Sequence, residues 1–128
     1  MNAFLSGLLV LTALTGRAQP DPEKVVQQQL DAYNARDIDR FVATYADSVE
    51  IFGFPNRPLM QGKAQLRTSY ADLFRRFPEN YAALLGRIVQ GNTVIDQEKV
   101  TGRGGAPTLV TAVYEVQNGL IRRVWFIR

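Results

Sequence analysis

The chain of 128 residues is 46% hydrophobic and 21% charged, with a formal net charge of +3 at pH 7. These values fit one globular domain and exclude a wholly disordered chain, and the charge is too small and too scattered to predict a nucleic-acid partner. The absence of cysteine and histidine excludes disulfides, thiol nucleophiles, Ser-His-Asp triads and imidazole metal sites. We therefore expect no metal and no cofactor, and chemistry confined to carboxylates, Tyr, Lys and Arg.

The first residues have the pattern of a secretory signal peptide. Residues 3–14 form an apolar run, and Gly16 and Ala18 are small residues at the positions that a signal peptidase reads. The run is shorter than the roughly 20 residues that span a bilayer. We predict a signal peptide over residues 1–18, a single domain over residues 19–128, and a secreted or periplasmic protein without a membrane anchor. A misassigned start codon or a buried N-terminal helix is the alternative.

Three helices are predicted in the first part of the domain. Asp21-Pro22 is a typical helix start, and the apolar spacing after it predicts a helix over residues 22–35. Asp37 caps a second, short helix whose apolar stripe extends to Tyr45. A third helix is predicted from Lys63 to Phe77, where a following proline ends it.

The remaining segments predict strands. A brief strand covers residues 48–54 and ends at a proline-rich break. Gly91-Asn92 and Asn118-Gly119 are two-residue turns typical of β-hairpins. The flanking strands are expected over residues 81–90, 93–101, 108–117 and 120–128.

The last turn also predicts a register. With Asn118-Gly119 as the loop, Tyr114 lies opposite Arg123 and Ala112 lies opposite Trp125, and these four side chains share one face. Both faces of this hairpin are rich in apolar residues, whereas an antiparallel sheet with one face in water alternates more cleanly. We therefore predict a homodimer formed through the outer face of the sheet.

The element order, together with particular sequence stretches, resembles the nuclear transport factor 2-like (NTF2-like) superfamily, and within it the SnoaL-like and ketosteroid-isomerase-like branch. The stretches are residues 33–39 (YNARDID), residues 41–47 (FVATYAD), residues 62–66 (GKAQL) with Tyr70, and the Asn118-Gly119 hairpin. The resemblance implies an α+β cone in which three N-terminal helices pack on a curved antiparallel β-sheet around a mostly apolar pocket. It does not choose a function, because the superfamily includes isomerases, cyclases, epoxide hydrolases and non-catalytic binding modules.

The chain departs from the ketosteroid isomerases at the positions that carry their chemistry. In an ungapped alignment, the catalytic Tyr position falls on Gln29, the general-base Asp on Gly53, and the oxyanion-hole Asp near Ala112. Isomerisation of steroids by that machinery is therefore not expected.

Six residues are predicted to line the pocket. They are Tyr33, Tyr70, Phe74, Tyr114, Arg123 and Trp125. The aromatic rings would contact a small apolar or amphipathic molecule, with tyrosine hydroxyls as donors, and the guanidinium would hold a carboxylate or an enolate. The alternatives are ordinary core packing for the aromatics and an arginine that extends into solvent.

Arg87, Asp96 and Glu98 form a second group of candidates. The Gly91-Asn92 turn places Arg87 opposite Asp96, with Glu98 two residues further on. An acid–Arg–acid relay of the kind implied by resemblance to epoxide hydrolases is one interpretation. A solvated cross-strand ion pair is the interpretation that we favour from the sequence.

Two functions are the main candidates from the sequence. The first is a secreted domain that binds a small hydrophobic or amphipathic molecule without chemistry. The alternative is a cofactor-independent isomerase, lyase or hydrolase that uses a pocket acid such as Asp96 or Glu98, and a purely structural dimerisation domain comes third. A buried pocket acid with a raised pKa would favour the enzyme, and a wholly apolar pocket would favour binding.

Overall fold

The computed structural model describes residue 10 and residues 20–128. The predicted signal peptide, apart from Val10, therefore lies outside the described residues. Within the described residues no helix is both long enough and apolar enough to cross a bilayer.

The three predicted helices are present. α1 (Pro22–Ala35) begins where the Asp21 carboxylate accepts a hydrogen bond from the Glu23 amide at 2.9 Å. α2 (Ile38–Ala43) begins at Asp37, whose carboxylate accepts a hydrogen bond from the Arg40 amide at 3.1 Å. α3 spans Lys63–Arg76.

The second helix is shorter than its apolar stripe predicts. Thr44 caps it, and its hydroxyl donates to the Phe41 carbonyl at 2.7 Å. The Thr44 carbonyl accepts the Ile121 amide at 2.9 Å, so the chain enters the sheet at this point. Tyr45 is therefore the first residue of a strand and not the last residue of a helix.

Six strands form one sheet in the order β2-β1-β6-β5-β4-β3. Their bounds are β1 Tyr45–Gly53, β2 Arg57–Gln61, β3 Tyr81–Gln90, β4 Thr93–Thr101, β5 Thr108–Gln117 and β6 Leu120–Ile127. β1 pairs with β6 in parallel and all other pairs are antiparallel, so the sheet is mixed. The prediction missed β2 because the segment contains Pro58, but an edge strand tolerates a proline, which only lacks one N–H donor.

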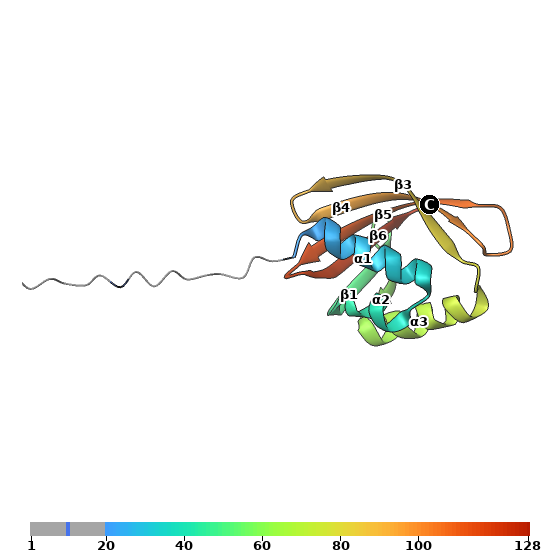
Figure 1. The fold of residues 1–128 in the computed structure, drawn as a ribbon, viewed down its shortest axis with the longest axis horizontal. Coiled ribbons are helices and arrows are strands. Elements are labelled where there is room, and N and C mark those ends of the chain that lie inside the picture. The colour runs from blue at the N-terminus through green and yellow to red at the C-terminus, as the bar shows by residue number, and fades with distance from the viewer. Residues whose placement is uncertain (1–9, 11–19) are drawn as a thin grey trace, which may run out of the picture.

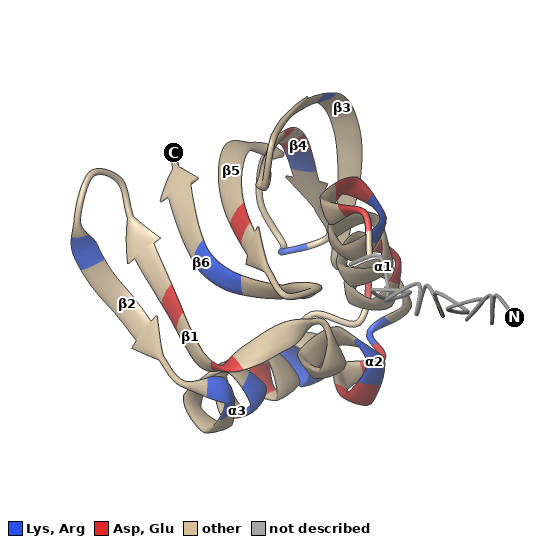
Figure 2. Cartoon of the chain, turned by 90° about the vertical axis from the view of Figure 1, so that its left-hand side faces the viewer, with Lys and Arg blue, Asp and Glu red and all other residues tan. Residues whose placement is uncertain are grey.

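The sheet curves around the helices, as Figures 1 and 2 show. α1 lies across the concave face, and α3 covers the end of the sheet near β1 and β2. The buried core fills the space between these layers, and its largest fully buried side chains include Phe41, Tyr45, Leu66 and Tyr114. The predicted α+β cone is therefore confirmed.

The closing hairpin contains an extra residue in β6. Asn118 and Gly119 form the turn with positive φ angles of 54° and 74°, as predicted. The register then shifts, so that Glu115 pairs with Arg123 and Tyr114 pairs with Val124. The predicted opposition of Tyr114 and Arg123 is therefore wrong.

Because of this β-bulge, the side chains of β6 that follow it lie on the opposite face of the sheet from the one predicted. Trp125 pairs with Val113 and not with Ala112. Because a shift of one residue moves every following side chain to the other side of a sheet, Arg123 and Trp125 lie on the outer, convex face. There Trp125 stacks on Phe52, with ring centroids 5.8 Å apart and 20° between the planes.

Candidate functional site

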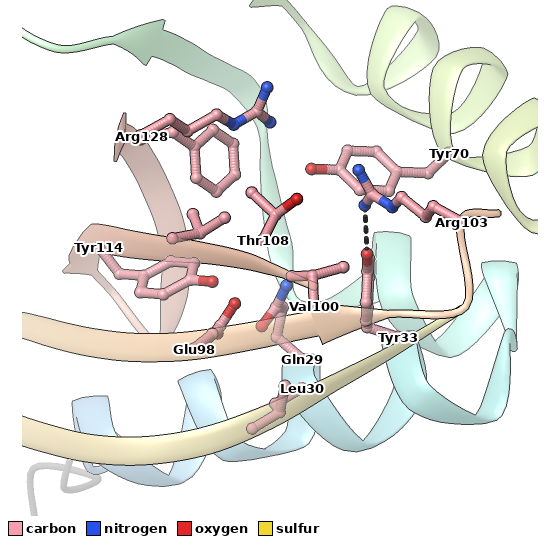
Figure 3. A pocket seen from close by; sticks show the side chains of 12 residues that line it. Gln29, Leu30, Tyr33, Tyr70, Glu98, Val100, Arg103, Thr108, Tyr114 and Arg128 are labelled. Atoms are coloured by element: carbon pink, nitrogen blue, oxygen red, sulfur yellow. Dashed lines mark hydrogen bonds between the residues drawn. The ribbon is translucent and has the colours of Figure 1, made fainter. Parts of the chain in front are cut away.

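A cavity of about 150 Å³ lies between α1, α3, the loop that joins β4 to β5, and the concave face of β4, β5 and β6. Its apolar walls are Leu30, Val100, Val110 and Phe126. Polar side chains occupy both ends, as Figure 3 shows. The inner end holds Glu98, Gln29 and the hydroxyl of Tyr114, and the outer end holds Arg103 and Arg128 beside Tyr70.

Three of the six predicted pocket residues line this cavity. Tyr33 comes from α1, Tyr70 from α3 and Tyr114 from β5. Burial raises the pKa of Tyr114 well above its usual value, and burial likewise raises the pKa of Tyr70. Both hydroxyls are therefore neutral hydrogen-bond donors at physiological pH.

The other three lie elsewhere. Phe74 is buried in the core, and its ring packs edge-on against Tyr33 at 5.6 Å between centroids, outside the cavity lining. Arg123 and Trp125 are on the convex face because of the bulge in β6. The Arg123 guanidinium pairs there with Glu115 at 3.2 Å, so it is not placed to hold a ligand in the cavity.

Glu98 is the acid that faces the cavity. Its strand alternation places it on the concave side of β4, and only 7% of the residue is exposed. Its Oε1 atom has no hydrogen-bond partner among the described residues. Burial, together with the nearby charge of Asp96 and against the smaller opposing effect of Arg87, raises the pKa of Glu98 to about 7. The side chain therefore exchanges between its protonated and ionised forms near neutral pH.

Asp96 and Arg87 form a buried ion pair. They face each other in the register, as predicted. Arg87 Nε and Nη2 donate to the two Asp96 carboxylate oxygens at 2.7 and 2.9 Å, and Arg87 Nη1 donates to Gln27 of α1 at 2.8 Å. Asp96 is fully buried, so the expected solvated pair is wrong. The physical reason is that α1 covers this part of the concave face, a tertiary contact that strand alternation does not reveal.

Gln29 is a cavity residue that sequence reasoning did not select. Its Nε2 donates to the Tyr45 hydroxyl at 3.1 Å, and its Oε1 is buried without a partner among the described residues. The sequence marks it only as the residue that replaces the catalytic tyrosine of the ketosteroid isomerases. That alignment position was the available signal that the side chain points into the cavity.

Arg103 and Arg128 at the outer end were also missed. Arg103 Nε donates to Asn80 Oδ1 at 2.8 Å, and its Nη2 donates to the Tyr33 hydroxyl at 2.7 Å. The Arg128 guanidinium lies over the Phe126 ring, 5.6 Å from its centroid. Arg103 belongs to the glycine-rich segment 102–107, whose composition predicts only a flexible loop.

No group of three or more Asp, Glu, His or Cys side chains in the described part of the chain is arranged to hold a metal ion. What the cavity offers is one titrating carboxyl, neutral tyrosine donors and two guanidinium groups. This set suits proton transfer and the binding of a small polar or charged molecule.

The profile of the SnoaL-like domain family matches residues 26–124, which cover all elements from α1 to β6 except their ends. The chain belongs to the SnoaL-like family. The resemblance to the NTF2-like superfamily is thereby confirmed. No match to this SnoaL-like chain is found among curated protein sequences.

Several solved structures share the fold of this SnoaL-like chain. An uncharacterized cystatin fold protein from Novosphingobium aromaticivorans is 29% identical, with a TM-score of 0.79 over 84% of this chain and 98% of that chain. An NTF2-like protein from Cytophaga hutchinsonii is 13% identical, with a TM-score of 0.72 over 87% and 92% of the two chains. An LEH-like epoxide hydrolase from M. tuberculosis is 17% identical, with a TM-score of 0.72 over 85% and 83%. At such low identity the last two show the fold alone.

Proposed function

We propose that the cavity binds a small amphipathic molecule and that Glu98 exchanges a proton with it, without a cofactor. The observation that carries the proposal is the buried Glu98 carboxyl, which faces the cavity with Oε1 unpartnered among the described residues. A buried polar atom without a partner costs free energy, so its retention in a cavity favours a role toward a ligand. The reaction class is that of an isomerase, a lyase or a hydrolase.

The surroundings of Glu98 suit general acid–base catalysis. A catalytic group is most effective when its pKa lies near the working pH, and burial raises the pKa of Glu98 to about 7. The ionised form can take a proton from a carbon acid or from water, and the protonated form can return it. The neutral hydroxyl of Tyr114 lies at the same end of the cavity and can donate to an oxygen that gains negative charge.

The size of the cavity limits the molecule. A cavity of about 150 Å³ is close to the volume that holds one benzene ring in a protein interior. A steroid or a large polyketide would extend beyond it through the outer end. A compound with one ring, or with a few carbon atoms, fits within it.

The test begins with the identity of the ligand. Native mass spectrometry of protein purified from its own host would detect a co-purifying small molecule, and its conversion would be followed with wild type and Glu98→Gln. The variant should keep the affinity within about threefold and lose turnover by roughly 100-fold or more. Glu50→Gln, which removes an acid on the convex face, is the matched control. A Glu98→Gln variant with unchanged kcat would overturn the catalytic role.

Binding without chemistry is the second candidate. It is favoured by the apolar side chains between the two polar ends and by the neutral tyrosine hydroxyls, which suit recognition as well as catalysis. It would be the correct function if the wild type binds the co-purifying molecule and releases it unchanged.

Secretion is part of the proposal and rests on the sequence. The apolar run over residues 3–14 and the small residues Gly16 and Ala18 support cleavage after residue 18 and release into a periplasmic or extracellular space. Edman sequencing of protein from the native host should give Gln19 as the first residue. An intact Met1 in the cytosol would contradict it.

We also propose a homodimer that pairs the convex faces of two sheets. Adjacent strands carry an apolar row of cross-strand neighbours on this face: Ile88, Ile95, Val113, Trp125 and Phe52. Ile88 is 63% exposed in the single chain. A continuous apolar row of this kind usually marks an interface, and a twofold axis uses one patch twice.

A further inference from the structure

The outer end of the cavity carries two arginines that have no acidic partner among the described residues. Many of the other arginines form ion pairs: Arg67 with Asp39 at 2.8 Å and Arg123 with Glu115 at 3.2 Å are examples. Arg103 and Arg128 have no carboxylate within 4.0 Å in the described part of the chain. Two guanidinium groups at one cavity mouth therefore have unused capacity for an anion.

Arg103 is held in a fixed orientation. Its guanidinium donates to Tyr33 and to Asn80, which is fully buried. The preceding Gly102 has a φ of +81°, and a Cβ atom there would lie 1.9 Å from the Glu79 carbonyl oxygen. The backbone at Gly102 is therefore packed against the turn that presents Asn80, and the Arg103 side chain binds the same turn. Since these contacts use only two of the five N–H groups, the guanidinium can still donate into the cavity.

The charge of both arginines reaches into the cavity. Arg128 lies over the ring of Phe126, which is part of the cavity wall. Burial raises the pKa of the Tyr70 hydroxyl, and the positive charges of Arg103 and Arg128 act against that rise. An anionic group beside Tyr70 would therefore be stabilised by both guanidinium groups.

We propose that the ligand of this cavity is a small carboxylic acid whose carboxylate lies between Arg103 and Arg128 and whose apolar body extends toward Glu98. The inference rests on the proposed function, because it concerns the same cavity. Guanidinium groups are well matched to carboxylates, since their N–H groups form charge-assisted and often bidentate hydrogen bonds. Glu98 lies at the opposite end of the cavity from the two arginines, so the carboxylate of the ligand and the reacting acid are kept apart (Figure 3).

The inner end of the cavity indicates which group the other half of the ligand carries. Gln29 Oε1 and Glu98 Oε1 are both buried acceptors without partners among the described residues. A hydroxyl group on the ligand would satisfy one of them. The best simple probe is therefore one ring that carries a hydroxyl and a carboxylate at opposite ends, and 4-hydroxybenzoate has this form at a size close to that of the cavity.

The test compares 4-hydroxybenzoate with 4-hydroxybenzamide, which has the same shape and no charge. Both are titrated into the ¹⁵N-labelled full chain, and the backbone amide signals of Thr108 and Val110 report on occupancy. We expect the carboxylate to bind at least about tenfold more tightly than the amide. Arg103→Gln and Arg128→Gln should each lower the affinity for the carboxylate by about fivefold or more. The affinity for the amide should stay unchanged in both variants. Arg122→Gln removes the same charge at the bulge of β6, outside the cavity lining, and should change neither.

Three results would overturn the inference. They are equal affinity for the two probes, arginine variants that bind like Arg122→Gln, and an absence of signal changes with either probe up to about 10 mM, the range of very weak binding. Arg128 is exposed, so Arg128→Gln tests the idea even if Arg103→Gln disturbs the loop. Glu98→Gln separates this inference from the proposed function. It should keep the preference for the carboxylate even if the catalytic role of Glu98 proves wrong.

Discussion

Asp96 and Glu98 project from the same face of β4, two residues apart, yet only one of them is paired. Both carboxylate oxygens of Asp96 accept hydrogen bonds from Arg87, whereas Glu98 Oε1 accepts none from the described residues. Asp96 thus connects β3 and β4 and, through Arg87 and Gln27, ties them to α1. Glu98 is left for the cavity. Two acids on one strand with such different surroundings suit separate roles: Asp96 stabilises the fold, and Glu98 has the proposed role toward the ligand.

The ionisation of Glu98 should make the stability depend on pH. Its pKa in the folded chain is about 7, above the ordinary value of 4.5, so the folded state holds the proton more tightly than the unfolded state. The cost of the buried charge is absent below about pH 4.5 and complete above about pH 7. The free energy of unfolding should fall by about 3 kcal/mol across this window. Urea denaturation at a series of pH values measures it. In Glu98→Gln this decrease in the free energy of unfolding should be absent. An equal decrease with pH in both proteins would contradict the raised pKa of Glu98.

Removing Arg87 should strongly destabilise the fold. Arg87→Met leaves Asp96 charged and fully buried without its partner, and breaking a buried pair in this way costs about 3–5 kcal/mol. Denaturation midpoints would measure the loss. The double variant Arg87→Met/Asp96→Leu should recover most of it, because no unpaired charge remains. Arg67→Met, which breaks the exposed pair with Asp39, is the control and should cost less than about 1 kcal/mol. A double variant less stable than either single variant would count against this explanation.

Gly102 should not tolerate a side chain. Gly102→Ala places a Cβ against the Glu79 carbonyl, and the shift that relieves the contact should cost about 2 kcal/mol or more and lower the melting temperature. Gly104→Ala is the matched control, since its φ is also positive at +78° but nothing lies within 4 Å. That variant should lose only about 1 kcal/mol. Similar melting temperatures for the two alanine variants would show that the loop is not anchored at Gly102.

A charge in the middle of the convex face should prevent the proposed dimer. Val113 lies at the centre of the apolar row, between Ile95 and Trp125. Val113→Lys would bury an unpaired charge in the interface, so sedimentation equilibrium should give the mass of one chain for the variant and of two chains for the wild type. Ser69→Lys, on the exposed side of α3, adds the same charge and should remain dimeric. A monomeric wild type at high micromolar concentration would contradict the proposal.

Local signals were sufficient to predict much of the fold. The carboxylates of Asp21 and Asp37 cap α1 and α2, and the Asn118-Gly119 turn forms where its sequence predicts it. The resemblance of several stretches to the NTF2-like superfamily predicted the cone. These features depend on neighbours in sequence or on a shared pattern, and both are visible without coordinates.

The site was harder to predict because it depends on contacts between distant elements. No residue type marks the extra residue at Arg122, yet it decides the side of the sheet on which Trp125 lies. The burial of Asp96 and Glu98 follows from α1 crossing the concave face, and the place of Arg103 depends on Tyr33 and Asn80. Whether these side chains face solvent or a cavity is decided by tertiary packing.

The place of β6 in the sheet has a consequence for how the chain folds. β6 (Leu120–Ile127) comes last along the sequence but lies in the interior of the sheet, between β1 and β5. The hairpin of β1 and β2 and the meander of β3, β4 and β5 have no strand pairing with each other except through it. The contact of Tyr45 with Ile121 therefore closes a long loop, and contacts of this kind slow folding. Because β6 is the only strand that pairs with both parts in the described sheet, a truncation within β6 would divide the sheet into two halves rather than shorten one of its edges.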